Sequence, residues 1–349
     1  MLFWDITSFF LCNIRNAKLS FHKNKLAYMI LFTLGCSTLM GLRNYTVGSD
    51  TISYQEFYNL ISVTPLQNLL GGFFFDSMEI GFVLLMKFCS FISSNYYFFQ
   101  LVISLLYCGG MSKFLYDNCQ NCIWSSFVFL GIGLFLLAFN AQRQMLAIMV
   151  AVNSWHFYIN KKYKLTIILL ALACLTHISS LIFVLAYIVY RFRKQKFVYV
   201  ILLAGILGAI VYYQNIINLL AQHISIYGNY YSNTKELQTA GLVKILWAII
   251  TLISIIVLGY RQSRMDQLRT YAIFSLIYVA TNLIGLNFNY FERIGWIFLP
   301  FVVLLFDGFS SILTNKVLSN VYYVGCLLSF MLYFLISSRT EQYIYQAWL

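Results

Sequence analysis

The sequence has little of what a protein surface needs in order to face water. Only 10% of the 349 residues are charged, whereas soluble globular chains carry about 25%. Two prolines and eleven acidic residues are spread over the whole length, and 61% of the residues are hydrophobic. This composition excludes a cytosolic enzyme, a secreted disulfide scaffold and a disordered chain. We therefore expect an integral membrane protein.

The hydrophobic residues form long runs of the kind that cross a bilayer as helices, at roughly 20 residues per ideal span. Such runs lie at 26–42, 80–94, 96–111, 123–139, 144–159, 165–176, 179–190, 197–213, 242–260, 270–284, 294–309 and 318–336. The segment 1–14 is apolar but carries Asp5, so we expect it to lie in the membrane interface. The pattern predicts an all-α polytopic membrane protein with about 10–12 transmembrane helices. We expect one transmembrane domain over residues 1–349, with outer loops at about 43–79 and 214–241.

The net charge of +12 comes from basic residues in short clusters between the apolar runs. Loops that stay in the cytoplasm carry such an excess of lysine and arginine, and no nucleic-acid-binding motif accompanies it. The charge therefore indicates topology and contact with anionic membrane lipid, and no nucleic acid is expected as a partner. All basic clusters fall on the cytoplasmic side if one run between 80 and 111 is re-entrant. The N-terminus is then cytoplasmic, and residues 43–79, 140–143, 177, 214–241 and 285–293 face outward.

The eight cysteines lie mostly inside apolar runs, where cysteine acts as a small hydrophobic residue. Cys119 and Cys122 form a lone C-x-x-C motif in a short loop. A zinc site would need a second pair or suitably spaced histidines, so we expect no metal.

A few polar residues interrupt the apolar pattern, although a charge at the bilayer centre costs about 2.5–3.5 kcal/mol. They are Arg43, Asp50, Glu56, Asp76, Glu79, Arg143, His177, Glu292 and Arg293. Structural roles are open for most of them. Arg43 and Arg293 can extend from helix ends to the interface, and Glu292 can neutralise Arg293. His177 can hydrogen-bond within the bundle, whereas Arg143 lies in a polar island that is harder to explain in this way.

In the preferred topology these residues gather at the outer face. Three arginines there suit an anionic, phosphate-bearing ligand, because the planar guanidinium matches phosphate oxygens. A carboxylate or an imidazole beside them can take a proton from an attacking hydroxyl. This combination is the outline of a site that transfers a group from a lipid phosphate at the membrane surface.

Five motifs carry most of these residues. They are G-L-R-N-Y-T-V-G-S-D-T-I-S-Y (41–54), M-E-I-G-F-V-L-L (78–85), N-A-Q-R-Q-M-L-A-I (140–148), L-T-H-I-S-S-L-I-F (175–183) and Y-F-E-R-I-G-W (290–296). In content and in order they resemble the EpsG and Wzy-like family of polysaccharide polymerases, over roughly residues 26–305. The sequence departs from that family at Ser49 and Thr51, which are often threonine and tyrosine, and at Ile80, which is commonly proline.

The resemblance implies a fold similar to GT-C-type lipid-dependent glycosyltransferases. It also implies that the protein polymerises polyprenyl-pyrophosphate-linked oligosaccharide repeat units into O-antigen or a related polysaccharide, at the outer face of the bacterial inner membrane. A sugar hydroxyl of one unit attacks the anomeric carbon of the growing chain, and polyprenyl pyrophosphate leaves. Arginines can replace a metal at this leaving group, so no metal and no cofactor are expected. The family also implies a chain-length regulator as a partner.

The same resemblance assigns roles to the polar residues. We expect Arg143, as part of the catalytic set, and Arg293 to bind the pyrophosphate, with Arg43 assisting. Asp50 and His177 are the catalytic candidates for the base or for positioning the acceptor. The other motif residues are expected to bind the sugar or the pyrophosphate, and they are Tyr54, Glu79, Gln142, Tyr290 and Glu292.

Two other functions remain open. A multi-pass membrane acyltransferase that modifies surface sugars would also use histidine and arginine, but it would bind an acyl-CoA from the cytoplasmic side. A lipid-linked oligosaccharide flippase should carry charges through the whole depth of the bilayer, whereas here they are predicted to cluster on one side.

Overall fold

The computed structural model describes residues 21–70, 78–193, 266–285, 289–310 and 315–337, together with 195, 312–313, 345–347 and a few isolated positions between 201 and 215. In these residues the secondary structure is helical apart from one β-bridge, between Arg43 and Ala347, which confirms the predicted all-α membrane fold class. The chain divides into two compact units, Met1–Leu181 with Phe334–Leu349, and Ile182–Tyr333. That the two units form one transmembrane domain stays a prediction.

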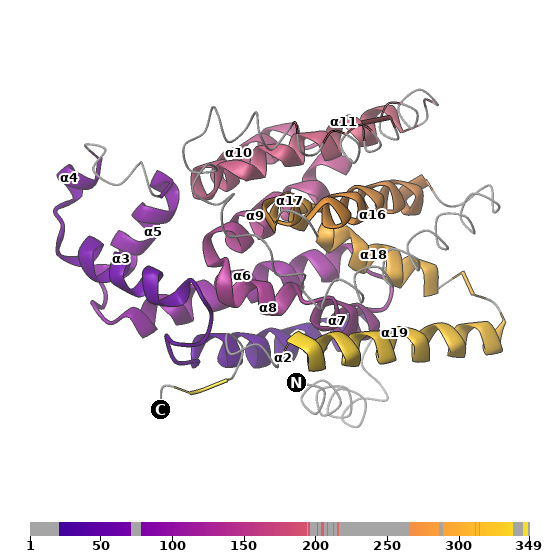
Figure 1. Cartoon of the computed structure of the whole chain (residues 1–349), viewed down its shortest axis with the longest axis horizontal. Helices are drawn as coiled ribbons and strands as arrows, with labels where there is room; N and C mark the ends of the chain where they lie inside the picture. Colours follow the sequence, from indigo (N-terminus) through magenta and orange to yellow (C-terminus); the bar gives the residue numbers. More distant parts are fainter. Residues whose placement is uncertain are drawn as a thin grey trace. The chain divides into compact units, whose positions relative to one another are not determined.

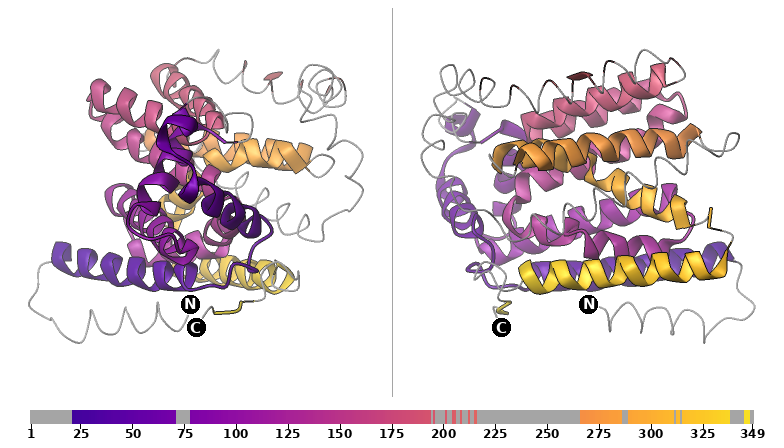
Figure 2. Two further views of the ribbon diagram at one scale, coloured as in Figure 1. Left: turned by 90° about the vertical axis from the view of Figure 1, so that its left-hand side faces the viewer. Right: turned by 45° about the vertical axis from the view of Figure 1, so that its right-hand side comes forward.

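Four long helices form the body of the first unit. α2 packs against α6, α6 packs against α9, and α9 packs against α10. Figures 1 and 2 both show α2 and α10 at opposite sides of this body. The bounds are α2 Phe21–Gly41, α6 Tyr96–Asn118, α9 Gln142–Ile159 and α10 Tyr163–Thr176. Asparagine caps the start of α6, where the Asn95 side chain accepts a hydrogen bond from the Tyr97 N–H at 3.0 Å.

The apolar run at 123–139 folds as two helices rather than one. α7 (Cys122–Gly131) and α8 (Leu134–Asn140) meet at an angle of 46°. Gly133 between them has φ +85°, a left-handed backbone conformation that glycine adopts without strain and that ends α7. A second break follows at Ala141 (φ −90°, ψ 56°), before α9 begins. The chain therefore reaches Arg143 through two successive helix breaks.

The expected outer loop at 43–79 contains two helices, α3 (Thr51–Val63) and α4 (Leu66–Leu70), and it leads into α5 (Ile80–Ser90). These three helices lie at one end of the first unit, on the left of Figure 1. Aromatic rings hold α3 and α5 against α6, with Tyr58 and Phe99 stacked at 5.0 Å and Phe82 5.8 Å from Phe99. Buried Lys87 of α5 donates to the carbonyls of Ile61 and Ser62, which satisfies the end of α3.

The second unit is built on α16 (Asp266–Gly285). It packs against α17 (Asn289–Gly295), the short 3-10 helix η3 (Trp296–Phe298) and α18 (Leu299–Ser310). The rings of Phe274 and Phe301 meet edge to face at 4.7 Å in its core. α11 (Val184–Phe192) contacts α16, and the Tyr322 hydroxyl of α19 (Lys316–Ser337) donates to the Phe306 carbonyl at 3.0 Å.

The predicted runs agree well with the helices. α2, α5, α6, α9, α10, α11, α16, α18 and α19 each overlap one of them. Within the described residues, three helices are long and apolar enough to cross a membrane, or four if α7 and α8 count as one span. α5 has 11 residues and is about 16 Å long, too short to cross a hydrocarbon core of about 30 Å alone. That one run between 80 and 111 is re-entrant stays a prediction. Apart from a few isolated positions between 201 and 215, the runs at 197–213 and 242–260, the segment 1–14, Asp76 and the loop at 214–241 lie outside the described residues. The count of 10–12 helices therefore also stays a prediction.

The close contact between α5 and α10 predicts that a side chain at Gly81 destabilises the protein. A Cβ on Gly81 would lie 2.6 Å from the Leu175 carbonyl oxygen, which is backbone and cannot rotate away. We expect Gly81→Ala to destabilise the purified protein by about 1–3 kcal/mol, the usual cost of overpacking, and to lower its melting temperature in detergent. Gly109→Ala is the matched control, because its nearest neighbour would be a Thr33 methyl at 3.9 Å. Equal melting temperatures for the two variants would contradict the close contact.

Candidate functional site

Three of the predicted site residues form one hydrogen-bonded and ion-paired group, which we call the Glu79 cluster: Glu79, Arg143 and His177. Oε1 of Glu79 accepts from Nδ1 of His177 at 2.7 Å and from the backbone N–H of Ile178 at 3.0 Å. Oε2 lies 2.9 Å from Nη1 of Arg143. The three side chains are each 21% exposed, so the group is sheltered but open to a ligand.

Each member of the Glu79 cluster stands where a helix begins or ends. Glu79 is the N-cap of α5 in an extended conformation, and its side chain makes no hydrogen bond to that helix. His177 is the extended C-cap of α10, before the 3-10 helix η1 (Ile178–Phe183). Arg143 is in the first turn of α9, directly after the break at Ala141. Helix ends bring backbone groups without intrahelical partners, and Glu79 uses one of them, the N–H of Ile178.

The close contact at Gly81 makes this arrangement possible. Gly81 is two residues after Glu79, and the Leu175 carbonyl is two residues before His177. A side chain at position 81 would force α5 away from the end of α10. The spacing of the motifs E-x-G and L-T-H therefore has a physical reason: the glycine lets the carboxylate reach the imidazole.

The Glu79 carboxyl is ionised at neutral pH. Burial alone would raise its pKa, but hydrogen bonds from His177 and Ile178 and the positive charge of Arg143 outweigh burial and lower the pKa from 4.5 to about 2. An ionised carboxylate only accepts hydrogen bonds, so Nδ1 of His177 carries the proton that it donates. In the neutral ring, Nε2 then holds a lone pair. The cluster thus orients one imidazole nitrogen as a base.

The turn that carries Arg43 and Asp50 is attached to the end of α8. Gly48 has φ +103°, and a Cβ there would lie 2.6 Å from the Phe139 carbonyl oxygen. The N–H of Ser49 donates to Oδ1 of Asn140 at 2.9 Å, and Oγ1 of Thr51 donates to the Phe139 carbonyl at 3.1 Å. The conformation of residues 47–51 therefore depends on the chain just before Arg143.

Arg43 is fully buried, and its guanidinium is used inside the protein. It donates to the carbonyls of Met40, of Val47 at 3.3 Å and of Phe139 at 3.4 Å, and it lies 4.7 Å from the centre of the Phe139 ring. Burial lowers its pKa to about 10, so it stays protonated at neutral pH. The Arg43 carbonyl accepts from the Gln100 side chain at 2.7 Å. These contacts hold the turn, and a contact of Arg43 with the pyrophosphate stays a prediction.

The remaining predicted residues of the first unit lie around this turn. Asp50 precedes α3 and accepts a hydrogen bond from the hydroxyl of the preceding serine at 3.1 Å. Tyr54 is buried with its ring 5.7 Å from that of Phe82. Gln142 is buried beside Arg143 and donates to the Tyr96 hydroxyl at 3.4 Å. Asp50 is therefore a neighbour of the turn, and the carboxylate that binds His177 is Glu79.

The predicted residues of the second unit lie in α17. The Glu292 carboxylate accepts a hydrogen bond from Trp296 Nε1 at 3.4 Å. Arg293 is exposed, with its guanidinium 5.7 Å from the centre of the Trp296 ring. Tyr290 belongs to the same helix. Convergence of these three residues with the Glu79 cluster stays a prediction.

The lowered pKa of Glu79 predicts a pH-dependent contribution to stability. A carboxyl whose pKa is lowered on folding stabilises the protein fully above its unfolded pKa of about 4.5 and loses this effect as the pH falls towards 2. We expect Glu79→Gln to lower the free energy of unfolding by about 1–3 kcal/mol at pH 7. The difference between wild type and Glu79→Gln should shrink as the pH falls from 4.5 to 3, measured by thermal unfolding in detergent.

Glu56→Gln provides the control for this experiment. Glu56 is an exposed carboxylate on α3, so its substitution changes the net charge equally without touching the Glu79 cluster. We expect an effect within about 0.5 kcal/mol at every pH. A pH-independent difference between wild type and Glu79→Gln would contradict the ionised state of Glu79.

Comparison with known proteins identifies the family. A model of the EpsG family matches residues 26–349, a range that includes the Glu79 cluster, the turn at 43–51 and α17. No curated protein sequence and no solved structure matches the chain. Because the match covers nearly the whole length, the chain belongs to the EpsG family.

Proposed function

We propose that this protein is a metal-independent glycosyltransferase that joins polyprenyl-pyrophosphate-linked oligosaccharide repeat units into O-antigen or a related surface polysaccharide. Membership of the EpsG family and the long apolar helices support a polymerase that works on lipid-linked sugars in a membrane. The observation that carries the proposal is the Glu79 cluster, in which an ionised carboxylate holds both a histidine and an arginine. The cluster places a base, His177, and a positive charge, Arg143, beside the same carboxylate.

In the proposed reaction His177 is the general base. The acceptor sugar hydroxyl gives its proton to Nε2 of His177, and its oxygen forms a bond to the anomeric carbon of the growing chain. The bond from that carbon to the pyrophosphate oxygen breaks, and polyprenyl pyrophosphate leaves with the electron pair. Glu79 stabilises the imidazolium that forms, because its carboxylate already accepts from Nδ1. The acceptor hydroxyl is therefore activated as a nucleophile only when it contacts His177.

Positive charge at the leaving group is the second part of the proposal. Arg143 brings a permanent charge beside His177, where it can stabilise the pyrophosphate that develops negative charge as the bond breaks. We propose Arg293, which is exposed on α17, as the second pyrophosphate-binding residue. Asp50, Tyr54, Gln142, Tyr290 and Glu292 are proposed to bind or to position the sugars. A chain-length regulator is proposed as a partner from the family alone.

Deletion of the gene, followed by complementation with variants, tests this function. Gel electrophoresis of the surface polysaccharide should show single repeat units in place of a ladder when the protein is absent. Wild type should restore the ladder, whereas His177→Ala should slow elongation by about 10²- to 10⁴-fold, the usual contribution of a general base. Arg143→Ala and Arg293→Ala should also abolish the ladder without reducing the amount of protein in the membrane.

Lys164→Gln, an exposed charge in the first turn of α10, is the control and should restore the full ladder. Full-length chains from both arginine variants would refute the assignment of the pyrophosphate site. Complete loss of export after deletion would indicate a flippase instead. Unchanged chain length with missing acetyl groups would indicate an acyltransferase.

We also propose that the Glu79 cluster faces the outer side of the bacterial inner membrane, with the N-terminus in the cytoplasm. A cysteine at position 143 or 177, in a variant without the other cysteines, should react with a membrane-impermeant thiol reagent added from outside. Positions 161 and 164, in and beside the loop between α9 and α10, should react only after the membrane is opened. Labelling of 143 and 177 from the cytoplasmic side would contradict the polymerase scheme.

A further inference from the structure

A groove lies on the first unit between α2 and α6, separate from the Glu79 cluster. It has a volume of about 390 Å³, within the range of about 300–1,000 Å³ for small-ligand sites. Its walls include Leu26, Ile30 and Leu34 of α2, and Gly109, Lys113 and Asp117 of α6. The three α2 side chains are each about half exposed, at 46%, 51% and 49%. They recur every four residues, so they form one continuous apolar stripe along the helix.

The two helices run antiparallel, which gives the groove two different ends. Thr33 donates to Ser112 at 2.7 Å, and Ser37 donates to the Ser104 carbonyl, so the start of α2 lies beside the end of α6. The end of the groove near Leu34 and Gly109 has no charged lining residue. A Cβ on Gly109 would meet only a Thr33 methyl, at 3.9 Å, so there is open space at this end.

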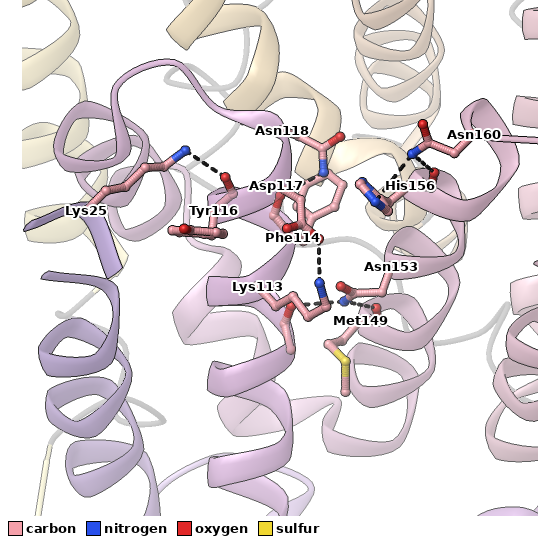
Figure 3. Close-up of polar contacts among 11 residues, drawn as sticks. Lys25, Lys113, Phe114, Tyr116, Asp117, Asn118, Met149, Asn153, His156 and Asn160 are labelled. Atoms are coloured by element: carbon pink, nitrogen blue, oxygen red, sulfur yellow. Dashed lines mark hydrogen bonds and ion pairs between the residues drawn. The ribbon is translucent and has the colours of Figure 1, made fainter. Parts of the chain in front are cut away.

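The other end of the groove is positively charged. Lys113 is 59% exposed on its side chain and pairs with the carboxylate of Asp117 at 2.6 Å. Lys25 lies at the start of α2, over the ring of Tyr116, and donates to the Tyr116 carbonyl at 2.7 Å. Figure 3 shows Lys113 reaching Asp117, and Lys25 of the neighbouring helix reaching the Tyr116 carbonyl. Two lysines and one carboxylate at this end leave an excess of one positive charge.

A polar contact joins α6 to α9 one residue after Gly109. The Asn153 side chain donates to the Gly110 carbonyl at 2.9 Å and to the Met149 carbonyl at 2.8 Å, and Figure 3 shows the bond to Met149. Along α2, Leu26 to Leu34 spans about 12 Å at 1.5 Å per residue, close to the half-thickness of a hydrocarbon core of about 30 Å. A molecule that fills the groove would therefore be charged at one end and apolar over about one leaflet.

We propose that this groove binds an anionic phospholipid. Its phosphate lies at Lys113 and Lys25, where the excess positive charge is, and one acyl chain lies along Leu26, Ile30 and Leu34 towards Gly109. In the topology expected from the sequence, the start of α2 is cytoplasmic, and the cytoplasmic leaflet carries the negative surface potential that suits this charge. The binding is reversible and makes no use of the Glu79 cluster, so it does not depend on the proposed reaction.

The test uses the full-length protein in a neutral detergent, titrated with phosphatidylglycerol or with phosphatidylcholine, and reads the melting temperature and the bound lipid by native mass spectrometry. Phosphatidylglycerol should bind and raise the melting temperature more than phosphatidylcholine at equal concentration. Lys113→Gln should weaken phosphatidylglycerol binding about fivefold, the effect of one lysine near an anionic surface. Gly109→Leu, which fills the apolar end, should weaken binding of the acyl chain by tenfold or more.

Two control variants separate this site from general attraction between charges. Lys164→Gln removes an exposed lysine on α10 outside the groove, so binding should be unchanged. Asp117→Asn removes the carboxylate that competes with the phosphate, so binding should be retained or become tighter. Equal stabilisation by the two lipids, or unchanged phosphatidylglycerol binding in both Lys113→Gln and Gly109→Leu, would overturn the proposal.

Discussion

The Glu79 carboxylate is the group on which the arrangement of the site depends. It joins the start of α5 to the end of α10 through His177 and Ile178, and to the start of α9 through Arg143. α5 is far from α9 and α10 in the sequence, and apolar packing alone has no direction. A sheltered carboxylate needs hydrogen bonds and an opposite charge, and these contacts fix the relative orientation of the three helix ends. The fold and the candidate chemistry thus rest on the same contact.

Helix breaks, rather than the long helices, supply the polar side chains. The left-handed residues Gly48 and Gly133 and the break at Ala141 bring irregular backbone next to Arg143. Irregular backbone inside a membrane protein is tolerated where neighbouring groups satisfy it. Here Arg43 does this by donating to three carbonyls, one of them that of Phe139. Buried Arg43 therefore holds the backbone just before Arg143, and Arg143 in turn pairs with the Glu79 carboxylate.

The helices were predictable because apolar runs of 12 to 19 residues in a chain with so few charges favour membrane helices. The ends of the helices and their packing partners were not predictable. The run at 96–111 continues as α6 to Asn118, since the polar end of a long helix extends beyond its apolar part. α3 and α4 were missed because they occur in a stretch rich in polar residues. The sequence offered Asp50 and His177 as candidates for the base or for positioning the acceptor, but it did not pair His177 with Glu79, because 98 residues separate the two. The one local signal was Gly81, whose missing side chain allows the close approach.

The kind of group that each cation contacts separates structural from chemical roles around the site in the first unit. Lys25 and Lys87 donate to carbonyls at the ends of α6 and α3, and Arg43 does the same beside α2 and α8. A backbone carbonyl stabilises a cation, but the carbonyl does not itself take up or release a proton. Such contacts therefore hold helices together and take no part in proton transfer. Arg143 differs because its partner is a full negative charge that also orients an imidazole. The chain has few charges, so a cation, a carboxylate and a histidine at one point are costly to retain for packing alone. This cost is the strongest physical reason to locate the proposed reaction at the Glu79 cluster.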